Sequence, residues 1–366
     1  MVPIIFDNNF GLEPSGAGMG LGSLPDAIRC EVTRERNGAF ELAMEYPLDG
    51  LNADKITIHR IVVAAVRNGD TSGQPFDIYR VEMQRDKMTV YAQHVVYRLA
   101  QIPVVPTTPI GGMSPRAAIG VILSSVAESV GPWTITADGS ASGYYSQREP
   151  ASLKSCLVGR RGSIVDIFGG TLIPNWASVT WYQTYGEDSH IWLYDDADYK
   201  NLKITATMED QATGCCPYWY DAQTDTLVTL PEKVVHSPLT QHYPMTDVVD
   251  YSQAFQTQPT ESQLREEAAI YAAQRQTSKM MIRLDFTPEE PRYNTDHTAL
   301  MHLDLCDTVH VRLSRFNLSI DATVIKTVYD ALAERYTSVV LNDISRSFTA
   351  AIMDLVSDGI ANNNRR

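Results

Sequence analysis

The clearest pattern of hydrophobic and polar positions lies between residues 30 and 46. In its second half, alternate positions are apolar and predict a strand with one buried face: Phe40, Leu42, Met44 and Tyr46. The dipeptide Asn37-Gly38 precedes this run and predicts a two-residue type I′ turn, because both residues adopt positive φ at low cost. With such a turn, Arg34 would lie opposite Glu41 as a cross-strand ion pair. The first strand of this hairpin alternates less regularly, so it either packs against another element or carries a β-bulge.

Similar patterns predict the remaining elements. Strands are expected at residues 55–66, 76–83, 88–97, 178–185, 203–208, 217–220, 226–229, 307–313, 322–329 and 336–341. Helices are expected where serine or threonine can cap a first turn, at Ser114-Pro115, Ser152, Ser163 and the capping box Thr260–Gln263. One more helix is predicted at residues 345–357, from an apolar stripe at helical spacing.

These elements predict an α+β, β-rich fold divided into four segments. Residues 1–105 are expected to form a first β-rich domain, and residues 106–210 an α/β middle domain. Residues 211–345 are expected to form a second β-rich domain that contains a helix at 260–274. A C-terminal helix and polar tail would then occupy residues 346–366.

An internal similarity links the first and last β-rich segments. Residues 54–93 and 307–343 both begin with an aspartate-led strand and continue through two further strands. The identities between them are too few to establish a duplication from the sequence.

Composition narrows the class of protein. Hydrophobic residues make up 44% of the 366 positions, which is ordinary for a globular protein. No apolar run approaches the ~20 residues that span a bilayer, and the N-terminal residues do not resemble a secretory signal, so no membrane anchor is expected. The net charge of −14 disfavours tight nucleic-acid binding, which requires clustered lysine and arginine. Five scattered cysteines fit neither a disulfide framework nor a paired metal site, and reduced thiols are expected at Cys30, Cys156, Cys215, Cys216 and Cys306.

No motif for phosphate or metal binding is complete. The glycine-rich segment Gly16–Gly22 lacks the GxGxxG spacing and predicts a flexible or closely packed loop. No GxSxG sequence is present to anchor a serine hydrolase site. Two histidine pairs do not match HExxH and are interpreted as surface or core residues: His236 with His242, and His297 with His302.

Two groups of acidic residues are candidates for a site. One group lacks the alternating pattern of a calcium-binding loop and predicts a solvated turn: Asp195, Asp196 and Asp198. The other group lies on the first hairpin, where a carboxylate pair could hydrolyse glycosides: Glu31, Glu35, Glu41 and Glu45. Residues on a regular hairpin more often face solvent or pair with arginine, so we do not assign catalysis to them.

Aromatic residues are concentrated in one segment. Six of them occur within twenty positions: Trp176, Trp181, Tyr182, Tyr185, Trp192 and Tyr194. Such a cluster can stack against sugar rings, or it can fill a core and subunit contacts in a β-rich protein. We favour the structural role, with sugar binding as an alternative.

Several passages in a fixed order carry a family resemblance. They are Leu24–Ile28, Cys30–Gly50, Gln74–Arg80, Met88–His94, Ser152–Cys156, Gly162–Gly170, Thr229–Val234, Pro259–Glu266, Asp307–Val309 and Ala322–Tyr336. Together they resemble the N-terminal hub region of phage minor structural proteins, also called tail-associated lysins. The resemblance extends over about residues 24–341. Cys306 and Asn342 stand where the family pattern has glycine.

The resemblance implies a homotrimeric hub at the tip or baseplate of a phage tail, related to the central hub of contractile-phage baseplates. Each chain would contribute two barrel-like β domains with an intervening α/β region. Three chains would then present six domains to a sixfold tail tube or distal tail protein. The resemblance also implies contacts with the tape measure protein and with receptor-binding or tail fibre proteins, and a lumen through which DNA passes. The protein would be made in the host cytoplasm and reside in the virion.

The sequence therefore predicts a structural protein and not an enzyme. No catalytic, cofactor-binding or metal-binding residue is assigned, and no cofactor is expected. Longer members of the family carry lytic domains after the hub, whereas this chain ends soon after its predicted terminal helix. Two alternatives stay open: a tail-associated cell-wall hydrolase of the endopeptidase type, and a carbohydrate-binding tail module.

Overall fold

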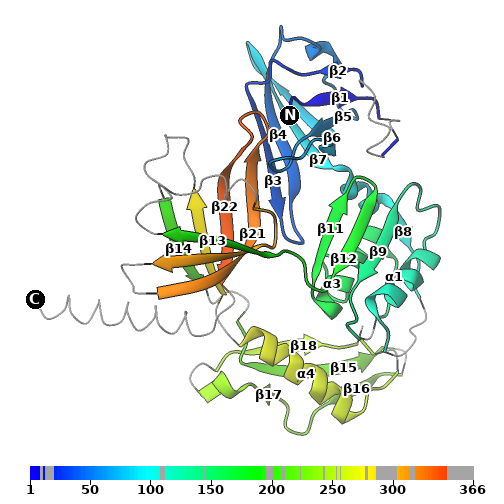
Figure 1. Ribbon diagram of the computed structural model, residues 1–366. Helices are drawn as coiled ribbons and strands as arrows, with labels where there is room; N and C mark the ends of the chain where they lie inside the picture. The colour runs from blue at the N-terminus through cyan, green and yellow to red at the C-terminus, as the bar shows by residue number, and fades with distance from the viewer. Residues whose placement is uncertain are drawn as a thin grey trace, which may run out of the picture.

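The computed structural model confirms a β-rich chain with few helices (Figure 1). It describes residues 1–8, 11–12, 20–107, 112–143, 145–147, 149–194, 201–207, 211–222, 224–241, 244–252, 254–255, 257–276, 279–285, 303–313 and 318–343. The α-helices are α1 (Pro115–Ser124), α2 (Leu153–Leu157), α3 (Ile164–Phe168) and α4 (Glu261–Arg275). Short 3-10 helices are η2 (Ala53–Lys55), η3 (Val95–Gln101) and η4 (Pro238–Gln241).

Strands account for the rest of the regular structure. In the first part of the chain they are β1 (Ile4–Phe6), β2 (Gly22–Ser23), β3 (Arg29–Glu35), β4 (Phe40–Pro47), β5 (Ile61–Ala64), β6 (Gln74–Met83) and β7 (Lys87–His94). In the middle they are β8 (Pro103–Val104), β9 (Thr134–Asp138), β10 (Ala151–Ser152), β11 (Thr171–Asn175), β12 (Ser178–Tyr182), β13 (Asp188–Tyr194) and β14 (Asn201–Thr207). The last are β15 (Gly214–Asp221), β16 (Thr226–Thr229), β17 (Val235–His236), β18 (Thr246–Asp250), β19 (Lys279–Asp285), β20 (Thr308–Leu313), β21 (Leu318–Asp330) and β22 (Arg335–Asp343).

Thirteen strands from both ends of the chain form one continuous sheet. Its order is β14-β19-β22-β21-β3-β4-β7-β6-β5-β1-β2, with β20 beside β21 and β13 beside β20. Strand β21 joins the two halves, because its first residues pair with β20 and residues 326–330 pair with residues 31–35 of β3. The expected pair of barrel-like domains is therefore not seen as two closed barrels among the described residues. The 13-residue length of β21 lets it extend beyond β20 and hydrogen-bond to the edge of the other half.

The two halves of this sheet repeat one strand order. We call β3 to β7 the first block and β14 with β19 to β22 the second block. The first is ordered β3-β4-β7-β6-β5, and the second is ordered β14-β19-β22-β21-β20. Each also carries a register shift in the same strand pair, between Ile78 and Arg80 in β6 and between Val324 and Lys326 in β21. The similarity noted in the sequence between residues 54–93 and 307–343 thus coincides with equivalent strands.

The first hairpin has the expected buried face but a different turn. Alternate residues of β4 are buried, as the pattern predicts. Asn37 has φ of 56°, whereas Gly38 is not in the positive region, so the type I′ prediction is wrong. The connection is longer than two residues, and Arg34 pairs with Phe40 instead of Glu41. The outer edge of β3 pairs with β21, which is the packing alternative and not a bulge.

The turn has this shape because its side chains contact the middle of the chain. The Asn37 side chain donates a hydrogen bond to the Gly170 carbonyl (3.0 Å) and accepts one from the Leu172 backbone (2.9 Å). Arg36 donates to the Thr171 hydroxyl (2.9 Å). The hairpin tip is thereby fixed beside β11 (Figure 1).

Three hydrophobic cores, the largest among the described residues, underlie this arrangement. One is shared by the first and second blocks, and includes Val32 and Met44 as well as Val324 and Leu341. A second lies between α1, α2, α3 and the three-stranded sheet β11-β12-β9. In the third, α4 covers the four-stranded sheet of β15 to β18 (Figure 1). The boundaries of the four predicted domains are not tested by these cores and stay predictions.

The capping signals in the sequence are confirmed. Ser114, Ser152 and Ser163 each accept a backbone hydrogen bond at the start of α1, α2 and α3. Thr260 and Gln263 form the predicted capping box of α4. Some predicted strands are shorter than expected. The strand predicted at 55–66 is reduced to β5 because a turn at Ile58-His59 precedes it, and the strand predicted at 88–97 ends where η3 begins. The strand predicted at 178–185 ends with β12 at Tyr182. The predicted helix at 345–357 lies outside the described residues.

Across the described part of the chain, no helix combines the length and apolar character needed to cross a bilayer.

Candidate functional site

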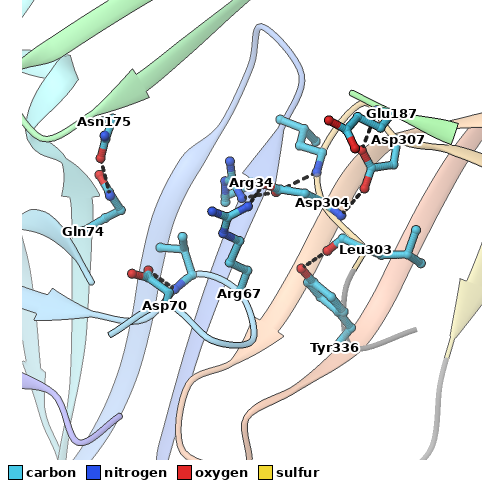
Figure 2. A network of polar contacts seen from close by, with 12 residues as sticks. Arg34, Arg67, Asp70, Gln74, Asn175, Glu187, Leu303, Asp304, Asp307 and Tyr336 are labelled. Carbon is cyan, nitrogen blue, oxygen red and sulfur yellow. Dashed lines mark hydrogen bonds and ion pairs between the residues drawn. The ribbon is translucent and has the colours of Figure 1, made fainter. Parts of the chain in front are cut away.

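A buried polar network connects the first and second blocks (Figure 2). Asp304, which precedes β20, accepts a hydrogen bond from Arg34 of β3 (2.6 Å) and another from Arg67 of the loop after β5 (2.5 Å). The Arg34 and Asp304 side chains are only 9% and 13% exposed, whereas Arg67 is 53% exposed. We call these three residues the block junction. Their charges balance in part, because one carboxylate faces two guanidinium groups.

Neighbouring groups fix the carboxylate of the block junction. The Asp304 backbone donates to the side chain of Asp307 (2.7 Å), which also accepts from the Glu187 backbone (3.0 Å). Burial raises the pKa of Asp307 above its ordinary value, although both of these backbone hydrogen bonds favour the charged form. The buried Tyr336 hydroxyl donates to the Leu303 carbonyl (2.5 Å). The segment before β20 is thus fixed by several short polar contacts.

Cys306 lies in the same turn. Its φ of 74° is in the left-handed region, which costs a residue with a Cβ more than it costs glycine. Glycine would adopt this conformation at lower cost, in agreement with the glycine that the sequence resemblance implies here. The Gly186 backbone packs directly against the Cys306 carbonyl, which leaves no room for a side chain at position 186.

A second polar cluster lies between β13 and β20. Asp188, His190 and His310 each direct one potential ligand atom to a common point, with these atoms within 4.8 Å of one another. The Asp188 carboxylate is 3.4 Å from His190 Nδ1 and 3.0 Å from His310 Nε2. Asp321 lies on the opposite side of the His310 ring, 2.6 Å from Nδ1. We call these four residues the His–Asp cluster.

The backbone of β13 is irregular at this cluster. The pairing of β13 with β20 shifts register between Asp188 and Trp192. Within this shift His190 has φ of 54°, and its backbone amide donates to the Asp188 carboxylate (2.9 Å). The Trp192 ring stacks on His310, with centroids 4.8 Å apart. The irregular backbone therefore places the His190 side chain close to that of His310. In a regular strand, the position of His190 would be set only by the alternation of side chains between the two faces of the sheet.

The two carboxylates raise the pKa of His310. The hydrogen bond to Asp321 is the largest cause, burial opposes it, and the bond to Asp188 adds to the increase. No sequence motif marks this cluster. The one local signal is the Asp188-Ser189-His190 triplet.

Exposed apolar side chains gather at the end of the first block that lies away from the Asn37 turn. Four large side chains there are between 38% and 73% exposed: Ile28, Leu48, Leu51 and Met83. Backbone hydrogen bonds bring their segments together, from Ile28 to Glu45 and from Leu48 to Asp86. We call this surface the apolar end.

The cysteines and hairpin glutamates have structural roles. All five cysteines are free, and all except Cys216 are buried. Glu31, Glu35 and Glu45 form ion pairs with Arg29, Lys326 and Lys87. The pairing with Lys87 lowers the pKa of Glu45. These contacts support the structural interpretation of the glutamates.

The aromatic cluster is divided between cores and surface. Trp176 and Trp181 are almost completely buried, and the Trp181 indole donates to the Gly169 carbonyl (2.9 Å). Neither ring offers a face to a sugar. Tyr182 and Tyr185 contact each other with centroids 4.9 Å apart, and Trp192 is partly exposed. The side chain of Tyr194 is not described.

Several other candidates can be placed only in part. His236 is exposed. Its partner in the first histidine pair, the second histidine pair and the acidic group all lie outside the described residues. These residues are His242, His297, His302, Asp195, Asp196 and Asp198. Of the glycine-rich segment, Gly20 has φ of 57°, and a Cβ there would lie 2.6 Å from the Ile5 carbonyl. This close approach agrees with a packed loop.

The fold resembles three solved tail proteins, two of them from prophages, along nearly the whole chain. A prophage tail protein of Listeria monocytogenes EGD-e has a TM-score of 0.62 at 10% identity, over 98% of this chain and 99% of that one. The 43 kDa tail protein of prophage MuSo2 from Shewanella oneidensis has a TM-score of 0.57 at 6% identity, over 94% and 98%. A tail protein of Neisseria meningitidis MC58 has a TM-score of 0.58 at 9% identity, over 94% and 96%. No family model and no curated protein sequence matches the chain.

Proposed function

We propose that this protein is a structural hub of a bacteriophage tail tip or baseplate, of the tail-associated lysin type. The observation that carries the proposal is the likeness of fold to two prophage tail proteins and to a tail protein of Neisseria meningitidis, over at least 94% of the chain. A likeness confined to one block would have supported only a shared module. The proposed hub joins the tail tube and distal tail protein to receptor-binding, tail fibre or lytic components, and also contacts the tape measure protein.

The repeated strand order supports a trimeric ring. Each chain carries two blocks with equivalent strands, so three chains would present six similar units around one axis. A closed ring of this kind satisfies the preference of oligomers for point-group symmetry. It would match a sixfold tail tube without requiring six copies of the chain.

The apolar end supports assembly as well. Stable protein interfaces bury about 800 Å² per partner and place apolar side chains at their centre. Ile28, Leu51 and Met83 are more than half exposed in the single chain, so they can supply such a centre. The net charge of −14 fits a lumen that DNA traverses without adhering, because like charges repel.

Assembly can be tested on the full-length protein. Mass photometry of the purified chain should give a particle of three times the chain mass, and negative-stain images should show a ring. Leu51→Glu combined with Met83→Glu should shift the particle to one chain, because two charges would be buried at the interface. Leu227→Glu, at an equally exposed position of β16, is the matched control and should leave the trimer intact.

A single-chain mass for the unchanged protein would contradict the trimer. A zymogram on bacterial cell walls tests the hydrolase alternative separately, and a clear lytic zone that depends on this chain would overturn the assignment as a non-enzymatic hub. Glycan-array binding lost in Trp181→Ala would favour the carbohydrate-binding module. The burial of Trp181 in the second core argues against that result.

A further inference from the structure

We propose that the His–Asp cluster binds one zinc ion through Asp188, His190 and His310. Two imidazole nitrogens and one carboxylate oxygen form a donor set typical of zinc. This inference concerns the single chain and does not depend on the proposed role in a phage tail.

The three candidate ligand atoms lie within 4.8 Å of one another, close to the spacing around a zinc ion. Ligand atoms about 2.1 Å from a tetrahedral zinc ion are roughly 3.4 Å from one another. The Asp188 carboxylate is 3.4 Å from His190 Nδ1 and 3.0 Å from His310 Nε2, so small side-chain shifts suffice. Water would occupy the fourth position in the isolated chain, because His190 and Asp188 are exposed.

The surroundings of His310 are those of a zinc ligand. Its Nδ1 faces the Asp321 carboxylate at 2.6 Å, which holds the proton on that nitrogen. Nε2, which contacts the Asp188 carboxylate at 3.0 Å, is then the nitrogen that would give up its proton and bind the metal. The Trp192 ring stacks on the imidazole and fixes its plane. A carboxylate behind a ligating histidine is the usual partner in zinc sites, because it orients the ring and increases its basicity.

The strained backbone at His190 supports the same assignment. A left-handed conformation at a residue other than glycine has an energetic cost, and such strain is concentrated at functional sites. Here it turns His190 toward Asp188 at the point where the pairing of β13 and β20 is interrupted. A bound zinc ion would join the two strands across this interruption, where regular ladder hydrogen bonds are lost.

The test uses the untagged full-length protein, freed of metal and titrated with zinc by calorimetry. His190→Asn should weaken the strongest zinc site at least tenfold, and Asp321→Asn should weaken it by about 10–100-fold, because the second carboxylate orients a ligand. Asparagine is chosen because it tolerates the left-handed conformation. His236→Asn, at an exposed histidine of β17, is the control and should leave the affinity unchanged.

Zinc should also raise the melting temperature of the wild type, with reversal by a chelator. Cobalt in place of zinc should give the visible absorption of a tetrahedral site, and His190→Asn and Asp188→Asn should both abolish it. Zinc affinity that is equal in the wild type and in both of these variants would overturn the proposal. Absence of zinc binding by the wild type would overturn it too.

Discussion

Replacing Asp304 with alanine is expected to lower the free energy of unfolding by about 3–5 kcal/mol. The change removes the carboxylate that neutralises Arg34, and the guanidinium is then left almost fully buried against the Phe40 ring. An unpaired charge in such a place is costly because the surrounding core cannot solvate it. Urea denaturation followed by tryptophan fluorescence measures the loss.

Arg67→Ala is the matched control for this prediction. Arg67 contacts the same carboxylate, but its side chain is 53% exposed, so its loss should cost only ~0–1 kcal/mol. Hydrogen exchange adds a local measurement, because the amides that pair β3 with β21 should exchange faster in Asp304→Ala than in Arg67→Ala. Equal losses of stability in the two variants would show that the burial of Arg34 does not determine the cost of removing its partner.

Patterns within a few consecutive residues were sufficient to predict part of the secondary structure, whereas several strands, among them β9, β11, β13 and β19, were not predicted. The buried face of β4 follows from alternation over seven residues, and α4 follows from the Thr260–Gln263 capping box. In both cases the determining contacts are between near neighbours in the chain. The likeness to phage tail proteins also agrees with the resemblance noted from short ordered passages.

The partner of Arg34 could not be predicted in this way. Its cross-strand neighbour depends on the length of the turn, and that length is set by contacts of Asn37 with Gly170 and Leu172. Its actual partner, Asp304, is 270 residues away. The continuous sheet was missed for the same reason, since it depends on the pairing of β21 with β3.

The His–Asp cluster shows a further limit of motif searches. Its histidines lie on β13 and β20, 120 positions apart, so no fixed spacing identifies them. The histidine pairs that are close in sequence, His236 with His242 and His297 with His302, do not belong to this cluster. A site assembled from two parallel strands becomes visible only when their register is known.

Acidification is expected to destabilise the protein through His94. This residue is fully buried, and burial, with a smaller effect from the positive charge of Arg34, lowers the pKa of His94 to about 3. Its Nδ1 accepts from the Val96 backbone (3.1 Å), its Nε2 lies 3.3 Å from the Gln74 side chain, and its ring stacks on Phe40. The neutral ring satisfies all these contacts, whereas the folded protein cannot solvate the imidazolium.

The direction of the pH effect follows from the two pKa values. Because the folded value of about 3 is below the unfolded value of about 6.5, the contribution of His94 is complete above pH 6.5 and is lost as the pH falls toward 3. The free energy of unfolding should decline by about 1.4 kcal/mol per pH unit in this window. His310 does not produce this decline, because its raised pKa gives stability that is fully present below pH 6.5.

His94→Asn isolates this effect, because the asparagine oxygen can accept the Val96 hydrogen bond but does not titrate. Urea denaturation between pH 6.5 and 4.5 should show a loss of about 2–3 kcal/mol in the wild type and a nearly flat profile in the variant. Carboxylates with lowered pKa, such as Glu45, lose their contribution only at lower pH. His236→Asn, which removes an exposed histidine, should keep the wild-type slope. If His94→Asn kept the full pH dependence of the free energy of unfolding, another buried group would be responsible for the uptake of the proton.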